Sequence, residues 1–284
     1  MIQAQLTAKK ILEAEPDAQI EYILMKTTGD LILDRTLEAI GGKGLFVKEL
    51  DEALLSYQAD ITVHSYKDMP MNPDPRLPVV AVSVREDPRD VLILPEGAER
   101  PDFDRPVGCS SARRRLQLKE LYPGWESRPV RGNLQTRLAK LERGEYGGLV
   151  LAAAGIRRLG LEHRISRYFS PEEMIPACCQ GTLAVQARAG EDVSFLRTFH
   201  DPRIWDISEA ERGFARELDG GCTLPIAAFG QIGDDDVLTL QGYYHDPVSG
   251  ATRTGSIRGA RKDARQLGIR LAVRLKEGHS DDGK

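Results

Sequence analysis

No run of apolar residues in this 284-residue chain is long enough to cross a lipid bilayer. The longest nearly unbroken apolar stretch, residues 147–156, is about half of the ~20 residues that a membrane-spanning helix needs. The first residues, Met1 to Gln5, also lack the basic and apolar regions of a secretion signal. We therefore expect a cytoplasmic protein with no membrane partner.

Cysteine is also scarce, and its spacing excludes the common metal sites. The chain has four cysteines, with no C-x-x-C spacing and no neighbouring histidine: Cys109, Cys178, Cys179 and Cys222. We therefore expect no structural zinc site and no bound metal, and we interpret the four residues as reduced thiols. The adjacent pair Cys178-Cys179 is compatible with redox chemistry or with a purely structural role.

The charge balance argues against a nucleic-acid partner. The 39 basic and 43 acidic residues give a net charge of −4, so no bulk positive charge is available to bind phosphate backbones. Arginines nevertheless outnumber lysines 28 to 11, and twelve arginines but two lysines fall between Arg105 and Arg167. A guanidinium can hold a carboxylate or phosphate with two parallel hydrogen bonds. This segment is therefore either a site for small anions or a solvated surface.

The chain alternates strand-like and helix-like stretches, which is typical of open α/β sheets. In the first block we predict helices over residues 4–12 and 47–57 and strands over residues 19–26, 61–64, 79–84 and 91–94. A stretch rich in proline and charge follows, and a crossing between domains is expected near residues 84–106.

The same alternation continues through a second and a third block. The second has predicted helices over residues 112–122 and 134–143, the latter with Asn133 as N-cap, and a buried strand over residues 148–154. In the third block, Ser208 and Glu211 have the spacing of a capping box, and Gly220-Gly221 is expected to end that helix. Strands over residues 237–244 and 251–257 and a helix over residues 260–275 complete a small α+β unit.

Three polar segments lie at the end of a predicted strand or at the start of a predicted helix, where backbone N–H groups converge and ligands gather in α/β folds. The first is Ile61-Thr-Val-His-Ser-Tyr-Lys-Asp-Met-Pro, the second is Gly108-Cys-Ser-Ser-Ala-Arg-Arg-Arg, and the third is Arg131-Gly-Asn-Leu-Gln-Thr-Arg. Each alone is compatible with helix caps and surface charge. Together, in separate blocks, they favour a site that binds carboxylates.

Two residues have side chains suited to chemistry beyond binding. Asp68 is a single carboxylate among cations, so we expect it to stay ionised and to stabilise a positive charge or orient an N–H donor. Cys222 is expected on a tight bend after two glycines. Its thiol is either an exposed nucleophile or a buried side chain with only a packing role.

These segments resemble the porphobilinogen deaminase (hydroxymethylbilane synthase) family over almost the whole chain. The resemblance rests on the order and number of several motifs: Thr27-Thr-Gly-Asp, Gly41-Gly-Lys-Gly-Leu-Phe-Val-Lys-Glu-Leu, Ala59-Asp-Ile-Thr-Val-His-Ser-Tyr-Lys-Asp-Met-Pro, Arg85-Glu-Asp-Pro-Arg-Asp, Gly108-Cys-Ser-Ser-Ala-Arg-Arg, Arg131-Gly-Asn-Leu-Gln-Thr-Arg-Leu, Ala153-Ala-Gly-Ile-Arg-Arg-Leu-Gly, Gln180-Gly and Gly220-Gly-Cys-Thr-Leu-Pro-Ile.

The resemblance implies an α/β fold with three domains. Two lobes similar to the halves of periplasmic binding proteins enclose a cleft, and a small C-terminal α+β domain carries a cofactor cysteine. The implied boundaries are residues 1–84 with 178–199 for the first lobe, 85–177 for the second lobe, and 200–284 for the C-terminal domain.

The resemblance also implies the reaction of a transferase in tetrapyrrole (haem) biosynthesis. Four molecules of the substrate porphobilinogen are condensed head to tail into linear hydroxymethylbilane, and ammonia leaves at each addition. The implied cofactor is a dipyrromethane primer, joined by a thioether to Cys222. We expect a monomer that binds neither nucleic acid nor membrane.

Individual site residues follow from the matching motifs. Asp68 matches the catalytic aspartate, which holds pyrrole N–H groups and stabilises the azafulvene cation formed when ammonia departs. The residues that match positions binding acetate and propionate arms are Ser65, Lys67, Ser111, Arg113, Arg114, Arg131, Arg137 and Arg158. Lys43 and Phe46 match the family's mobile cleft loop.

The sequence departs from the family pattern at three places. The usual first strand, with its Gly-Thr-Arg-x-Ser pattern, has no counterpart, since Met1 to Gln5 match the start of the following helix. Cys109 replaces a threonine, and Cys178-Cys179 replaces a Val-Gly pair.

Two alternatives to an active transferase remain open. One is a family member inactivated by the loss of the first strand. The other is a two-lobed, non-catalytic protein that binds carboxylates, although simple capture does not require Asp68 or Cys222.

Overall fold

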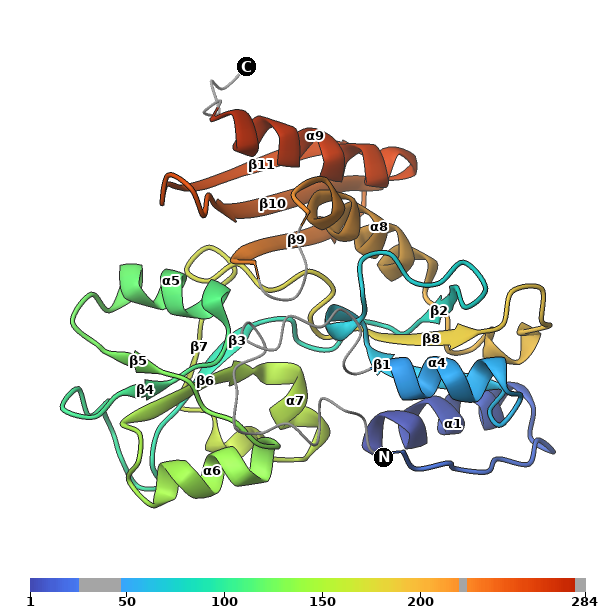
Figure 1. Cartoon of the computed structure of the whole chain (residues 1–284), viewed down its shortest axis with the longest axis horizontal. Helices are drawn as coiled ribbons and strands as arrows, with labels where there is room; N and C mark the ends of the chain where they lie inside the picture. The colour runs from blue at the N-terminus through green and yellow to red at the C-terminus, as the bar shows by residue number, and fades with distance from the viewer. Residues whose placement is uncertain (26–46, 220–223, 279–284) are drawn as a thin grey trace.

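The computed structural model describes residues 1–25, 47–219 and 224–278. Its secondary structure falls into three groups, each built around a sheet (Figure 1). In the figure, the group on the right contains the N-terminal helix, the group on the left contains the middle of the chain, and the group at the top contains the C-terminal part.

The first sheet has three described strands in the order β1-β8-β2, namely β1 (Ile61–Ser65), β8 (Leu183–Ala187) and β2 (Val79–Val82). β8 is antiparallel to both neighbours, although about a hundred residues separate it from β2 in the sequence. Helices α1 (Ile2–Ala14) and α4 (Lys48–Leu55) contact β1. The chain therefore leaves this group after β2 and returns to it through β8.

The second sheet has five strands in the order β5-β4-β6-β3-β7. Their bounds are β3 (Asp90–Ile93), β4 (Val107–Gly108), β5 (Ser127–Arg128), β6 (Gly148–Ala152) and β7 (Arg167–Tyr168). β4 is parallel to β5 and β6, whereas β3 is antiparallel to β6 and β7. The accompanying helices are α5 (Ala112–Leu121), α6 (Leu134–Glu142) and α7 (Ala153–Arg158).

The third sheet is an antiparallel meander in the order β11-β10-β9, with β9 (Ile226–Ile232), β10 (Val237–His245) and β11 (Thr252–Ala260). Helices α8 (Pro202–Glu217) and α9 (Ala264–Glu277) pack against each other and against this sheet. A Cβ atom at Gly268 of α9 would lie 2.0 Å from the carbonyl oxygen of Ala210 in α8. The close approach of the two helices therefore requires glycine at that position.

Four short 3-10 helices complete the described secondary structure. They are η1 (Tyr66–Asp68), η2 (Glu162–Arg164), η3 (Ser194–Leu196) and η4 (Arg261–Asp263). Within the described ranges, none of the helices has the length and apolar character needed to span a bilayer.

Two extended segments connect the first and second groups and run side by side. The Glu86 amide donates to the carbonyl oxygen of Gly181 at 3.2 Å. Gly181 has φ +92°, and a Cβ atom there would lie 2.3 Å from the Glu86 carbonyl oxygen, so only glycine fits. The two α/β groups and the small C-terminal unit confirm the predicted fold class.

Most of the predicted elements are confirmed within one to four residues at their ends. Asn133 is confirmed as the N-cap of α6, because its side chain accepts a hydrogen bond from the Thr136 amide at 2.9 Å. The helix predicted over residues 4–12 is α1, and the strand predicted over residues 148–154 is β6.

The strand predicted over residues 19–26 is wrong for the part that the structure describes. Residues 19–25 have no regular secondary structure, and Tyr22, Ile23 and Leu24 are exposed by 41%, 47% and 72%. Apolar and β-branched composition favours a strand only where a neighbouring strand pairs with it. No described strand pairs with this segment.

The predicted capping box at Ser208 and Glu211 is also wrong. Helix α8 begins earlier, at Pro202, and Asp201 caps it by accepting hydrogen bonds from the amides of Arg203 and Ile204 at 2.8 and 3.0 Å. Proline at the first helical position suits this start, because its missing N–H would have no partner there. Ser208 and Glu211 are buried in the interior of the helix.

Candidate functional site

The first part of the site lies where β1 ends. Alternate residues of β1 are buried, and the strand stops at Ser65, where the chain tightens into η1. This turn leaves Tyr66 buried, Lys67 half-buried and Asp68 exposed. A single turn of 3-10 helix therefore presents the predicted lysine and aspartate together, with Tyr66 anchoring the turn in the core.

Ser65 is joined to the N-terminal helix. Its hydroxyl accepts a hydrogen bond from the side-chain amide of Gln3 in α1 at 2.7 Å. Because Gln3 lies in the first turn of α1, the start of that helix is held beside the end of β1.

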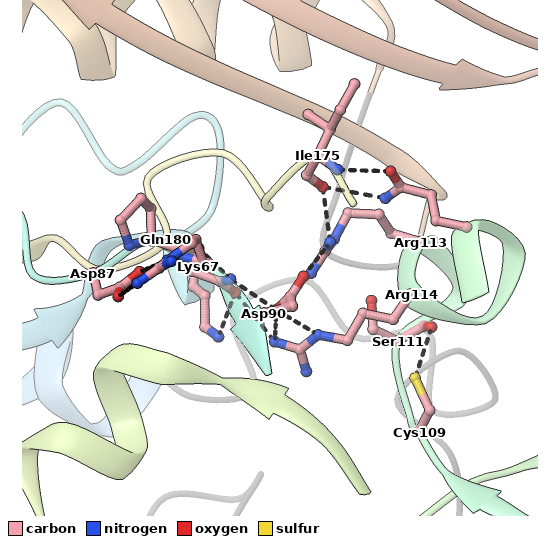
Figure 2. Close-up of polar contacts among 12 residues, drawn as sticks. Lys67, Asp87, Asp90, Cys109, Ser111, Arg113, Arg114, Ile175 and Gln180 are labelled. Atoms are coloured by element: carbon pink, nitrogen blue, oxygen red, sulfur yellow. Dashed lines mark hydrogen bonds and ion pairs between the residues drawn. The ribbon is translucent and has the colours of Figure 1, made fainter. Parts of the chain in front are cut away.

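The second part of the site is the first turn of α5. Ser111 is the N-cap residue, but its side chain makes no capping hydrogen bond. Arg113 and Arg114 follow, and their guanidinium groups converge on Asp90 at the start of β3 (Figure 2). Arg113 Nη1 lies 2.6 Å from Asp90 Oδ2, and Arg114 Nε lies 2.9 Å from Oδ1.

Asp90, Arg113 and Arg114 form a buried ion cluster. Asp90 is completely buried, and the two arginines are exposed by 3% and 7%. Burial by itself would raise the pKa of Asp90, but the charges and hydrogen bonds of Arg113 and Arg114 hold that pKa below its ordinary value. Two cations therefore share one carboxylate. In addition, the Nε atom of Arg113 has no hydrogen-bond partner within the described residues.

Gln180, in the segment that returns to the first group, connects this cluster to Lys67. Its side-chain oxygen accepts hydrogen bonds from Lys67 Nζ at 3.3 Å and from Arg114 Nη2 at 3.2 Å. Its side-chain nitrogen donates to Asp90 Oδ1 at 2.8 Å and to the Pro88 carbonyl at 2.7 Å. Figure 2 shows these contacts between the two groups of the fold.

The electrostatics of Lys67 agree with a crowded cationic site. Burial lowers the pKa of Lys67 to about 8; Asp68 opposes this shift, and Arg114 adds to it. A lysine with this pKa is still predominantly charged at pH 7, so it can pair with a carboxylate.

The third part of the site is the turn that leads into α6. Gly132 has φ +111°, and its carbonyl oxygen accepts a hydrogen bond from Arg137 Nε at 2.8 Å. Burial lowers the pKa of Arg137, and the cations Arg114 and Arg131 lower it further. Arg131 and Arg137 are both half-buried. The arginines of α5 and α6 therefore lie close enough to repel one another.

Seven of the eight predicted carboxylate-binding residues belong to the three segments that form this site. We call the charged members and the two carboxylates beside them the cationic cluster: Lys67, Asp68, Asp90, Arg113, Arg114, Arg131 and Arg137. Among the members of the cluster, the five cations outnumber the two carboxylates by three. Such a donor set fits a ligand that carries several carboxylates.

Arg158 has different surroundings. Its guanidinium donates to the Gly181 carbonyl at 2.6 Å, and burial lowers its pKa while Glu86 opposes that shift. It lines a pocket of about 670 Å³ whose walls include α1 and the segment from Ser83 to Glu86. The structure therefore places Arg158 at the crossing between the first and second groups.

Three predicted residues lie outside the described part of the chain. These are the predicted site residues Cys222, Lys43 and Phe46. The helix end predicted at Gly220-Gly221 also lies outside the described residues.

Sequence reasoning missed Asp90 and Gln180. Both stand in motifs that carried the family resemblance, but neither had been given a role. The segment after residue 105 has many more arginines than acidic residues, and a buried guanidinium group needs a carboxylate partner. This excess indicates that some partner, such as Asp90, comes from outside the segment. Gln180 offered no such signal, because a neutral side chain that joins distant segments is visible only in the fold.

Comparison with known families gives two matches along the chain. Residues 1–195 match the family described as "Porphobilinogen deaminase, dipyromethane cofactor binding domain", and residues 205–277 match "Porphobilinogen deaminase, C-terminal domain".

Relatives named porphobilinogen deaminase match nearly the whole chain. The relative from Alkaliphilus oremlandii is 54% identical over 282 residues, which cover 99% of this chain and 95% of that protein. The relative from Acetivibrio thermocellus is 53% identical and covers 97% and 94% of the two chains. The relative from Nitrosomonas europaea is 41% identical and covers 96% and 90%.

Among solved structures, the chain is similar to the periplasmic VFT2 domain of Bordetella pertussis BvgS. That match has a TM-score of 0.40 and 17% identity, and it covers 69% of this chain and 74% of the other.

Proposed function

Because the chain belongs to the porphobilinogen deaminase family of transferases in tetrapyrrole biosynthesis, we propose that it condenses four porphobilinogen molecules into linear hydroxymethylbilane with release of ammonia. The observation that carries the proposal is the cationic cluster around Asp68. Each pyrrole unit brings two carboxylates, so a growing chain needs several guanidinium partners.

The residues of this cluster fit the dipyrromethane cofactor of the family. Ser65, Lys67, Ser111, Arg113, Arg114, Arg131, Arg137 and Arg158 are proposed to hold its acetate and propionate arms and those of the substrate. The sulfur of Cys222 is proposed to hold the cofactor by a thioether. When bound, the dipyrromethane supplies the pyrrole end to which substrate units are added.

Ser111 and Arg113 each have unused hydrogen-bonding capacity that supports this role. The Ser111 side chain makes no capping hydrogen bond, and Arg113 Nε has no partner within the described ranges. Both lie at the N-terminus of α5, where backbone N–H groups also favour an anion.

Asp68 is the proposed catalytic residue. Its side chain is exposed at the end of η1, whereas Asp90 is buried and held by two arginines. An exposed carboxylate can accept hydrogen bonds from pyrrole N–H groups and stabilise the positive charge that develops on the substrate as ammonia departs. The surrounding cations bind the carboxylate arms and leave Asp68 facing the ring.

The domain organisation is part of the same proposal. We assign residues 1–84 and 178–199 to the first lobe, 85–177 to the second lobe and 200–284 to the C-terminal domain. Support comes from the strand pairing, because β8 joins β1 and β2, whereas β3 to β7 pair among themselves and β9 to β11 form a sheet of their own. The proposed cleft loop contains Lys43 and Phe46.

We also propose that the protein is a cytoplasmic monomer that binds neither nucleic acid nor membrane. The net charge of −4 supports the first exclusion. Cys109, Cys178 and Cys179 are buried, unpaired thiols, which fits a reducing compartment.

Intact mass tests the proposed function. The purified protein is expected to carry added mass equal to one dipyrromethane, and Cys222→Ser is expected to lose it. Cys109→Ser is the matched control and should keep the added mass. An unmodified wild-type mass that stays unmodified after incubation with porphobilinogen would instead indicate an inactive family member or a non-catalytic carboxylate-binding protein.

A further inference from the structure

Helix α8 of the C-terminal unit contacts the backbone just after Asp68. The guanidinium of Arg212 donates to the carbonyl oxygens of Pro70 and Met71, the latter at 3.0 Å. One turn further along α8, Arg216 Nε donates to the same Met71 carbonyl at 2.8 Å. Two arginines of one helix therefore hold two consecutive peptide groups of another part of the molecule.

Arg212 also contacts the start of the turn that carries Asp68. Its guanidinium carbon lies 4.7 Å from the centre of the Tyr66 ring, and Tyr66 is the first residue of η1. Within η1, the Met69 amide donates to the Tyr66 carbonyl at 3.2 Å. Arg212 thus holds residues on both sides of Asp68, while Asp68 itself stays exposed.

The charge of Arg212 has no carboxylate partner among the described residues. The side chain is exposed by 1%, and its Nε and Nη1 atoms make no hydrogen bond within those residues. Carbonyl oxygens and an aromatic face are what stabilise this buried cation. Burying a cation in this way is costly, and a side chain needed only to fill space would be apolar.

Helix α8 is itself fixed to the crossing between the lobes. Glu211, next to Arg212, is completely buried and accepts hydrogen bonds from Arg85 at 2.7 Å and from the amides of Cys179 and Gly230. Glu211 joins α8 to the crossing, and Arg212 joins α8 to η1. The helix therefore contacts both the crossing and the turn that carries Asp68.

We propose that Arg212 is a positioning residue for Asp68: from the C-terminal domain it fixes the turn Tyr66–Asp68 and the peptide groups that follow. The inference rests on the proposed catalytic role of Asp68. Arg212 reaches no reacting atom; it sets where the exposed carboxylate stands relative to the cations of the cluster. Small displacements of a catalytic group are enough to lower the rate of a reaction by about 100-fold.

The test compares Arg212→Met with Arg203→Met, with both proteins carrying the cofactor. Methionine keeps the apolar stem of the arginine but removes the guanidinium. Arg203 is a matched control, because it is exposed on the same helix and donates to the carbonyls of Ile232 and Gly233 inside its own unit, at 3.0 and 3.1 Å.

We expect Arg212→Met to lower kcat by about 10- to 100-fold with KM changed by less than about threefold. Arg203→Met should change neither quantity. Arg212→Lys keeps a cation that reaches one carbonyl but lacks the planar fork, so it should restore only part of kcat. Unchanged kcat in Arg212→Met, or a rise in KM alone, would overturn the proposal.

Hydrogen exchange provides a readout that does not depend on activity. Arg212→Met should accelerate amide exchange at residues 66–69 and at Met71 and leave exchange in β10 and β11 unchanged. If that variant does not fold, Arg216→Gln removes one hydrogen bond to Met71 and should give a smaller change of the same kind. Unchanged exchange at residues 66–69 and at Met71 in a folded Arg212→Met protein would contradict the proposal.

The outcomes also separate this inference from the proposed function. If Asp68→Asn retains normal turnover, the catalytic role of Asp68 fails, whatever Arg212 does to exchange. If Asp68→Asn is inactive and Arg212→Met is fully active, the positioning role alone fails.

Discussion

At the scale of single residues, two neighbouring carboxylates have opposite environments. Asp68 is exposed at the end of η1, whereas Asp90 is buried between two arginines and a glutamine. The first is exposed, whereas the second holds protein cations in place. The predictions for the two residues therefore differ in kind.

Asp68→Asn should abolish turnover and leave the fold intact, because the amide keeps the size of the side chain but removes its negative charge. The measurements are steady-state production of hydroxymethylbilane and the free energy of unfolding. Near-normal turnover in the variant would remove Asp68 from the catalytic role.

Asp90→Asn should instead destabilise the protein. Removing this charge leaves two buried guanidinium groups without a counter-ion, at a cost of about 3–5 kcal/mol in the free energy of unfolding. Asp87→Asn is the matched control: Asp87 pairs with Arg89, whose side chain is 40% exposed, so removing its charge leaves no buried cation without a counter-ion and should cost less. Equal effects of the two substitutions in denaturant unfolding would contradict the assignment of Asp90.

His64 makes the stability of the fold depend on pH. Burial lowers the pKa of His64 to about 4, so the folded protein keeps this side chain neutral, while an unfolded chain protonates it below about pH 6.5. Its contribution to stability is therefore complete above pH 6.5 and is lost as the pH falls toward 4. Between pH 7 and pH 5 the loss amounts to about 2 kcal/mol.

The check is denaturant unfolding of the wild type and His64→Gln at both pH values. The wild type should lose about 2 kcal/mol more than the variant between pH 7 and pH 5. Equal losses would show that His64 does not titrate in this way.

Residue identity predicted the cations of the site better than it predicted their partners. Arg113, Arg114, Arg131 and Arg137 were expected to bind carboxylates of a ligand. The structure adds that the first two already share Asp90, which lies more than twenty residues away in the sequence. Such pairing depends on how the fold brings the start of β3 to the first turn of α5, which no local pattern encodes.

At the scale of elements, the start of α8 shows that residues typical of a helix N-terminus can also occur inside a helix. Ser208 and Glu211 have the spacing of a capping box, but Asp201 and Pro202 begin the helix one and a half to two turns earlier. Buried interior positions then give Glu211 and Arg212 their long-range contacts. Local spacing cannot distinguish a cap from an interior pair when both are followed by an apolar stripe.

Asp201 therefore has a measurable role as a cap. Asp201→Ala should lower the free energy of unfolding by about 1 kcal/mol, because two amides at the start of α8 lose their acceptor. Asp201→Asn, which can cap equally well, should leave stability nearly unchanged. A loss as large in the asparagine variant would mean that the negative charge matters more than the cap.

The turn before α6 is the element on which ligand binding depends most directly. Arg131→Leu removes one cation of the cluster and should block cofactor assembly or chain extension, seen as lost added mass or lost bilane. The matched control is Arg128→Leu, because Arg128 is exposed on the neighbouring strand β5. Normal bilane yield from Arg131→Leu would refute carboxylate binding at that turn.

At the scale of the whole molecule, the three units meet through buried polar contacts. Gln180 and Asp90 join the second lobe to the returning segment, and Glu211 joins that segment to α8. The fold class and six of the eleven described strands could be predicted from periodicity and from the family resemblance, whereas β4, β5, β7, β8 and β9 were not predicted. These junctions could not be predicted, because each depends on single side chains from distant parts of the chain.

The charge distribution predicts a salt dependence for substrate binding. The whole chain is acidic, but the cationic cluster carries an excess of three positive charges that a substrate with two carboxylates would meet. Screening shortens from about 10 Å at 0.1 M salt to about 3 Å at 1 M, so KM should rise over that range while kcat changes less. A KM that does not respond to salt would contradict electrostatic binding of the substrate.

The most direct test of the account is a crystal structure of the protein carrying its cofactor. The account predicts that carboxylates of the bound pyrroles lie within ion-pair distance of Arg131 and Arg137 and that the Asp68 carboxylate faces a pyrrole N–H. Pyrrole carboxylates that point to solvent, with Asp68 remote from every ring, would contradict it.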